Sequence, residues 1–124
     1  MKYIVKEEEK MVIAIIEDTE FDVMNYIKAV NDDLFLFGND MYNKLLLNNT
    51  YKGIAKCHPD DEFDVEKGKK IAKARAVFKH DSAFNKKLNY YYDHKMEIFT
   101  KMKNKSSEKY FKALRQKEKV EKMP

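Results

Sequence analysis

The chain has 124 residues, is 44% hydrophobic and carries a net charge of +4. This length fits one domain, and the hydrophobic content excludes wholesale disorder. A single cysteine, Cys57, excludes an internal disulfide, and Met1 is followed by charged residues with no apolar run long enough for a signal peptide or a membrane span. We therefore expect one cytoplasmic domain over residues 1–124 that makes no contact with membranes.

Charge divides the chain into two unlike halves. Residues 1–64 carry seven Lys and fourteen Asp plus Glu, a net charge of −7, whereas residues 65–124 carry sixteen Lys, two Arg and seven acids, a net charge of +11. A basic half of this kind favours anionic partners such as nucleotides, nucleic acid or acidic protein surfaces. A solvated, lysine-rich helix surface without a partner is the alternative.

The first half begins with two short apolar segments. Residues 2–6 alternate weakly, residues 11–16 read MVIAII, and residues 7–10 between them are charged. Segments rich in β-branched residues on either side of a polar turn predict two strands.

A helix is expected next, with Asp18 or Thr19 as its N-cap and Asn31 close to its end. Its apolar positions recur at a spacing of three, and they are Phe21, Met24, Ile27 and Val30.

The middle of the chain predicts a hairpin or meander. Residues 34–37 fit a short strand, residues 38–40 fit a turn, and the Asn pair at 48–49 fits a tight turn into a strand over residues 50–57. Residues 1–58 are thus expected to be mainly sheet, with one helix.

After Pro59 the apolar period changes to that of a helix. Asp64 is a good N-cap for a helix that begins near Val65. Gly68 in its second turn costs about 1 kcal/mol relative to Ala, which indicates a close backbone approach at this position. The apolar face of this helix is predicted to consist of Ile71, Ala74, Val77 and Phe78. The small residues Ala72, Ala74 and Ala76 are expected to let the helix lie close against a sheet.

Two further helices are predicted in the basic half, residues 65–124. Asp81 is expected to cap a long helix, residues 104–107 to break it, and Ser107 to cap a last helix. The predicted fold is therefore α+β: a small antiparallel sheet in the N-terminal half, packed with a capped helix and followed by long C-terminal helices.

The long helix carries an apolar stripe from Phe84 to Met102. Its length of roughly 30 Å is about the width of a small domain, so we expect part of the stripe to meet a second copy in a homodimer or larger homo-oligomer. An intramolecular hairpin with residues 107–122 is the alternative.

The segment around Cys57 and His58 has metal-ligating residue types but not the spacing of a metal site. Neighbouring residues in a turn point in different directions, and no second set of ligands has zinc spacing. We expect a structural turn, an inert cysteine and no bound metal or cofactor. The sequence lacks a phosphate loop, a serine nucleophile elbow and a paired-cysteine motif, so an enzyme is not expected.

Binding is the remaining chemistry. The planar guanidinium of Arg75 or Arg115 suits phosphate, and Phe84 or Tyr91 can stack on a base. An equally weighted alternative makes Arg75 an ion-pair partner of the acidic residues 60–62.

Residues 53–76 read GIAKCHPDDEFDVEKGKKIAKARA. This segment resembles a signature of small bacterial and phage proteins of unknown function that have a double-stranded-RNA-binding-like fold. There a strand with G-x-A-x-C-x-P precedes an acidic turn and a helix ending in A-x-x-R-A. The resemblance covers about a fifth of the chain and implies a strand-turn-helix unit. It implies no RNA binding, because fold alone does not specify activity.

The layout of an N-terminal sheet followed by long C-terminal helices also resembles the phage sponge family called Thoeris anti-defence protein 1. Such proteins hold a cyclic ADP-ribose signalling molecule in pockets between subunits. The resemblance implies a phage anti-defence protein that sequesters a cyclic nucleotide in the host cytoplasm. An anti-CRISPR-type inhibitor of an effector protein, or a nucleic-acid-binding accessory protein, is the alternative. The expected ligand-binding residues are Lys56, Arg75, Phe84, Tyr91, Lys109 and Arg115.

Overall fold

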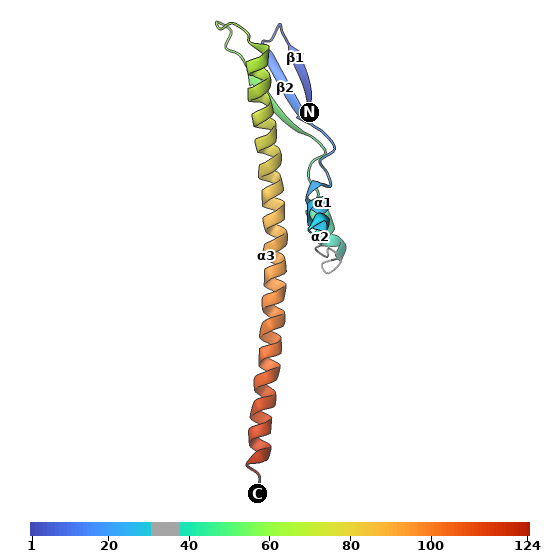
Figure 1. Ribbon diagram of the computed structural model, residues 1–124, viewed down its shortest axis with the longest axis vertical. Helices are drawn as coiled ribbons and strands as arrows, with labels where there is room; N and C mark the ends of the chain where they lie inside the picture. Colours follow the sequence, from blue (N-terminus) through green and yellow to red (C-terminus); the bar gives the residue numbers. More distant parts are fainter. Residues whose placement is uncertain (31–37) are drawn as a thin grey trace. The chain divides into compact units, whose positions relative to one another are not determined.

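The computed structural model describes residues 1–30 and 38–124 and divides into two compact units, Met1–Asn89 and Tyr90–Pro124. Its fold class is α+β, as predicted (Figure 1). The elements are strands β1 (Lys2–Lys6), β2 (Met11–Ile16) and β3 (Tyr51–Lys56) and helices α1 (Asp22–Ala29), α2 (Gly38–Lys44) and α3 (Val65–Glu121).

The strands form an antiparallel sheet in the order β1-β2-β3. Three of the four predicted strands are confirmed within one residue of their expected bounds. The β1–β2 turn closes through a hydrogen bond of 3.1 Å from the Lys10 amide to the Glu7 carbonyl, and Lys10 takes a φ of 50°. β2, the strand that is apolar at every position, lies in the centre of the sheet.

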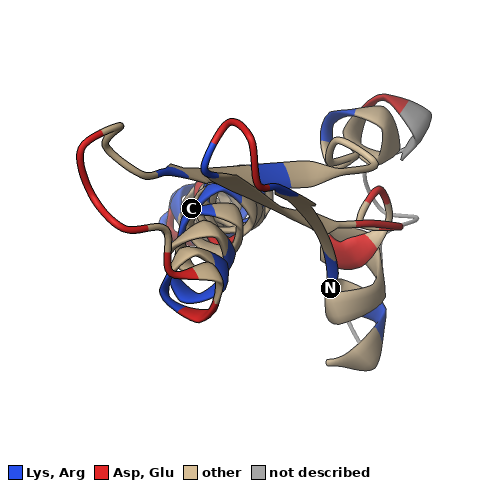
Figure 2. Cartoon of the chain, turned by 90° about the horizontal axis from the view of Figure 1, so that it is seen from above, with Lys and Arg blue, Asp and Glu red and all other residues tan. Residues whose placement is uncertain are grey.

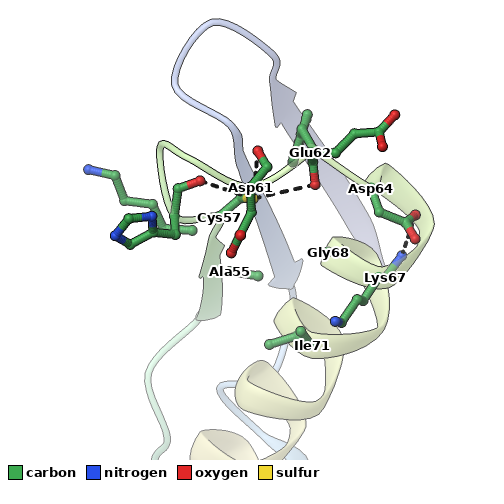
Figure 3. A pocket seen from close by; sticks show the side chains of 11 residues that line it. Ala55, Cys57, Asp61, Glu62, Asp64, Lys67, Gly68 and Ile71 are labelled. Atoms are coloured by element: carbon green, nitrogen blue, oxygen red, sulfur yellow. Dashed lines mark hydrogen bonds between the residues drawn. The ribbon is translucent and has the colours of Figure 1, made fainter.

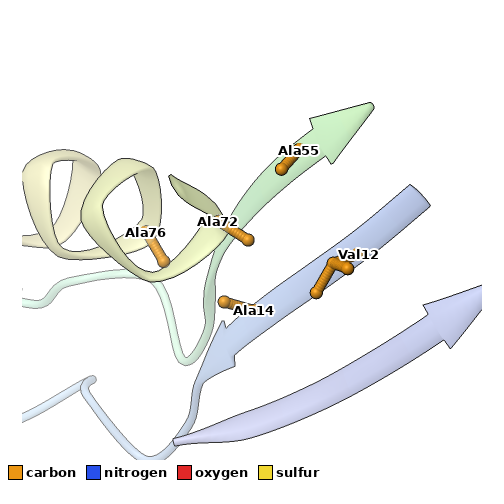
Figure 4. Packing of buried hydrophobic residues seen from close by; sticks show 5 residues of the cluster. All are labelled: Val12, Ala14, Ala55, Ala72 and Ala76. Carbon is orange, nitrogen blue, oxygen red and sulfur yellow. The ribbon is translucent and has the colours of Figure 1, made fainter. Parts of the chain in front are cut away.

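One face of the sheet packs against the first turns of α3 through small side chains (Figure 4). These small side chains allow the helix backbone to lie close to the strands. The buried residues of this cluster are Val12, Ala14, Ala55, Ala72 and Ala76.

Two glycines mark where α3 approaches the sheet most closely. A Cβ atom at Gly53 would collide with the backbone of Ala72 and Ala76, and a Cβ atom at Gly68 would lie 2.8 Å from Val12. The close approach predicted at Gly68 is confirmed. The close packing expected of the small residues is confirmed for Ala72 and Ala76, which face the sheet, but not for Ala74, which is exposed. The predicted apolar face with Ile71 and Phe78 is wrong by about one position, and both of those side chains are exposed.

α1 is confirmed, but its predicted cap is wrong. The helix begins at Asp22 with Phe21 as N-cap and no side-chain capping bond. Thr19 instead donates its hydroxyl proton to the Asn48 carbonyl, and its amide donates to the Asn49 carbonyl at 3.2 Å. Thr19 thereby joins the start of α1 to the segment that leads into β3.

The turn predicted over residues 38–40 is wrong, because these residues begin α2. Residues 1–58 therefore contain two helices and not the one expected, and α2 replaces the hairpin or meander predicted in the middle of the chain. Met41 and Leu45 are both buried, at the four-residue spacing that places side chains on one helix face. Burial of this pair outweighs the turn preference of the residues before it. The strand predicted over residues 34–37 lies outside the described residues.

α3 is continuous from Val65 to Glu121, so the helix ends predicted before Asp81 and at residues 104–107 are wrong, and so is the helical hairpin. After Gly68 the sequence contains neither Gly nor Pro until Pro124, and polar residues alone do not end a helix. In the described part of the chain, no helix combines the length and hydropathy needed to cross a membrane. Acidic residues lie in the β1–β2 turn and in the loop before α3, whereas basic residues recur along α3 (Figure 2).

Candidate functional site

A hollow of about 590 Å³ lies where α3 passes the outer strand β3. β3 contributes Ile54, and the helix contributes residues whose spacing places them on one face beyond the strand edge. The contact of Gly53 with Ala72 and Ala76 sets this arrangement, because it seats the neighbouring helix face beside the strand. The lining residues are Ile54, Ile71, Ala74, Arg75, Phe78 and Lys79.

Arg75 is held against the strand edge. Its Nη1 donates a hydrogen bond of 2.6 Å to the carbonyl oxygen of Ile54. The guanidinium has five N–H donors, so others remain for a ligand. Among the described residues, no ion pair joins Arg75 to the acidic residues 60–62, so the alternative interpretation of Arg75 is not supported.

Phe78 is the most exposed large apolar side chain of the described residues, at 73%. It lies on the same helix face as Arg75 and Lys79, and the half-exposed Ile54 borders it. A flat aromatic surface beside two cations can stack on a nucleobase and contact its phosphate. This combination is the chemistry expected of the protein, but Phe78 takes the place expected of Phe84.

A second hollow, of about 460 Å³, lies at the start of α3 (Figure 3). It contains the carboxylates of Asp61, Glu62 and Asp64 beside Lys56 and Lys67. With three acids in its lining, it does not favour an anionic ligand.

The turn that lines this second hollow is held by its own hydrogen bonds. The Lys10 ammonium donates to the carbonyl oxygens of Pro59 at 2.9 Å and Asp61 at 2.6 Å, and the Asp61 amide donates to the His58 carbonyl at 3.0 Å. The Cys57 thiol lies 3.5 Å from the His58 carbonyl oxygen (Figure 3). These contacts support the structural interpretation of the turn. The described residues contain no group of three His, Cys, Asp or Glu that could hold a metal.

The predicted N-cap of α3 is confirmed. Asp64 Oδ1 accepts a hydrogen bond of 3.1 Å from the Lys67 amide, and the Gly68 amide donates to the Asp64 carbonyl at 2.9 Å. The cap fixes where α3 begins and therefore which of its side chains reach the β3 edge.

The expected site residues of the first unit lie in three different places. Lys56 lines the acidic hollow and Arg75 lines the hollow beside β3. The ring of Phe84 packs edge-on against Tyr26 at 5.5 Å between centroids and lies 6.1 Å from the ring of His80. Phe84 therefore belongs to the packing between α1 and α3, and the structure does not group these three residues.

The remaining expected residues belong to the second unit, residues 90–124. Tyr91 is fully buried, and the Lys95 ammonium lies 6.0 Å from its ring centre. Lys109 is exposed, and Arg115 lines a shallow hollow that also contains Phe111. Of the three, only Lys109 and Arg115 are accessible to a ligand.

The second unit carries a row of exposed cations at spacings of three, four or seven residues, which keep them on one side of the helix. Residues 90–124 contain nine Lys, one Arg and five acids, a net charge of +5. The row consists of Lys101, Lys105, Lys112, Arg115 and Lys119.

His80 was not expected to matter, but it joins α3 to α1. Its Nε2 lies 2.7 Å from Asp22 Oδ2 and its Nδ1 lies 2.9 Å from Asp81 Oδ1. Burial alone would lower the pKa of His80, but the hydrogen bonds and charges of Asp81 and Asp22 together outweigh it and raise the pKa above the usual 6.5. The neighbouring pair His80-Asp81 was visible in the sequence, whereas Asp22, 58 residues away, was not.

Comparison with known proteins finds no match among family models, curated proteins or solved structures. The resemblances to the double-stranded-RNA-binding-like proteins and to the sponge family stay predictions from the sequence.

Proposed function

We propose that this is a non-enzymatic phage anti-defence protein that sequesters a nucleotide-derived immune second messenger, a cyclic ADP-ribose isomer or a cyclic oligonucleotide, in the host cytoplasm. One observation carries the proposal: the exposed ring of Phe78 lies with Arg75 and Lys79 in a hollow beside β3. Its volume of about 590 Å³ is within the usual range of small-molecule sites, roughly 300–1,000 Å³.

Each part of the ligand has a counterpart in the hollow. Phe78 would stack on one base of the ligand, and stacking of this kind contributes about 1–3 kcal/mol. Arg75 is held in place by the Ile54 carbonyl, so little rotamer entropy remains to be lost when it binds a phosphate. Lys79 adds a second cation on the same helix face.

A ligand in this hollow keeps one side in water, because Phe78 is 73% exposed. Tight sequestration therefore requires a second copy that covers the ligand, as in the sponge family. Part of the expected dimer stripe is already covered within the chain, since Phe84 packs on Tyr26 and Tyr91 is buried. Phe99 and Met102 stay exposed, so we propose that they make a further contact between copies, separate from the one that covers the ligand.

Isothermal titration of the full chain with cyclic ADP-ribose isomers and cyclic dinucleotides tests this proposal. Phe78→Ala should weaken binding about tenfold or more, equivalent to about 1.4 kcal/mol. Tyr110→Ala is the matched control, because Tyr110 is an exposed aromatic residue on the same helix, in the second unit. Absence of binding to any of these nucleotides, or equal losses in the two variants, would contradict the proposal.

Nucleic-acid binding is the second candidate, and the row of cations in the second unit favours it. Polyanion binding of this kind weakens steeply with salt, because each neutralised phosphate releases counterions. Lys105→Gln with Lys112→Gln should then reduce affinity for single-stranded RNA and flatten the salt slope by about 1.4, because each phosphate contact on a single strand contributes about 0.7. A shallow slope with wild-type protein would exclude this candidate. The same row could serve an anti-CRISPR-type inhibitor, in which case a protein effector and not RNA alone would co-elute.

A further inference from the structure

The face of the sheet opposite α3 is apolar at its centre and basic at its corners. In β2, Val12 and Ala14 point toward α3, so Met11, Ile13 and Ile15 point to the opposite face. The register places Ile4 of β1 and Ile54 of β3 on either side of Ile13.

The same register surrounds this apolar centre with four lysines. Met11 pairs with a lysine on each side, and so does Ile15. All four lysines are exposed. They are Lys2 and Lys6 in β1 and Lys52 and Lys56 in β3.

This face has the composition of a surface that a partner covers. Ile4 is 38% exposed and Ile54 is 45% exposed, although an antiparallel sheet with one face in water ordinarily carries polar residues there. The sequence MVIAII of β2 is apolar at every position, a pattern typical of strands covered on both faces. α3 covers only one of them. On the other face Ile15 is already buried within the chain, at 7%, whereas Met11 and Ile13 are half-buried.

We propose that this face binds an amphipathic helix of a partner protein, with acidic residues on both sides of its apolar stripe. The corner lysines are separated by about 14 Å along the strands and about 10 Å across them. A helix 10–12 Å in diameter fits the distance across the strands, and about nine of its residues, at 1.5 Å per residue, span the distance along them. Apolar side chains would lie on β2, and carboxylates would face the lysines of β1 and β3.

Charge favours this occupant over the alternatives. A second copy placed face to face would bring four lysines against four lysines, which is repulsive. Nucleic acid would find phosphate partners but no aromatic ring, because Tyr3 lies on the other face of β1, with the cluster that packs against α3. Lys2 already lies 3.9 Å from a carboxylate oxygen of Glu17, so a carboxylate can approach one of these corners.

The proposal does not depend on the hollow beside β3, although Ile54 borders both. A direct test uses two synthetic helical peptides with the same leucine stripe, one flanked by Glu on both sides and the other by Lys. Amide chemical shifts of the full chain should change in β1, β2 and β3 on addition of the Glu peptide.

A charge exchange then tests the lysines themselves. Lys6→Glu with Lys56→Glu should weaken binding of the Glu peptide at least tenfold and strengthen binding of the Lys peptide. The control Lys101→Glu with Lys103→Glu changes the net charge equally, but in the second unit, and should leave both affinities within about twofold. The proposal is wrong if the control behaves like the first variant, or if the shifts fall outside the sheet. It is also wrong if a single-stranded oligonucleotide, and not the Glu peptide, shifts these strands.

Discussion

Replacement of Gly53 by alanine tests the contact from which the candidate site is built. The added Cβ atom would meet the backbone of Ala72 and Ala76, which a helix cannot move locally. Overpacking of this kind typically lowers the free energy of unfolding by about 1–3 kcal/mol. Because the atoms that the new Cβ meets belong to a rigid helix backbone, we expect Gly53→Ala to cost about 3 kcal/mol. α3 must then shift from β3, which would also open the hollow.

Gly68→Ala is the matched control. Its Cβ atom would lie 2.8 Å from a methyl group of the buried Val12, a side-chain contact whose cost we expect at the lower end of overpacking, about 1 kcal/mol. The cost of this contact is offset by about 1 kcal/mol of gained helix propensity, so the net change should be close to zero.

Urea unfolding followed by circular dichroism compares the two variants. With an m-value of about 2 kcal/mol per M, a difference of about 3 kcal/mol separates their midpoints by roughly 1.5 M. Equal midpoints would refute the packing of α3 on β3 and with it the geometry of the hollow.

Three further outcomes are expected. The pKa of His80 is raised in the folded state, so its ion pair with Asp22 contributes full stability below pH 6.5 and loses it as the pH rises through the folded-state pKa. The difference in urea midpoint between wild type and Asp22→Asn should therefore shrink from pH 6 to pH 9, and a constant difference would argue against this linkage. Asp64→Ala should cost about 0.5–2 kcal/mol through loss of the cap, and an unchanged midpoint would show that the cap is dispensable. Phe84→Ala should lower stability by roughly 2 kcal/mol, about half the cost for a fully buried Phe, because Phe84 packs on Tyr26. Phe78→Ala should leave stability unchanged, because Phe78 is exposed, and a larger loss for Phe78→Ala than for Phe84→Ala would contradict the roles assigned to the two rings.

Features that depend on neighbours in the sequence could be predicted. The β-branched segments specify the strands, Asp64 specifies the start of α3, and Gly68 indicates its close approach to the sheet. These signals are local, because a strand's alternation, a helix cap and a missing side chain each act over a few residues. The errors at Asp81 and Ser107 arose because residues that can cap a helix are also tolerated inside one.

The accessible face of α3 was decided by the tertiary structure. Both Ile71 and Phe78 are apolar and suit a core. Because Gly53 has no Cβ atom, the backbone of Ala72 and Ala76 can lie against the sheet at this position, and the larger side chains of α3 then face outward. Phe84 is partly covered because Tyr26 of α1 packs against it.

The candidate site follows from this placement. Arg75 was identified from the sequence because its charge and planar shape suit phosphate wherever it lies. Its partners, Phe78 and the carbonyl of Ile54, were not, because a helix presents every residue type in every direction until it packs. The sequence therefore determined which residues could bind an anion. The packing of α3 on β3, across the loop of residues 57–64, decided which of them lie together.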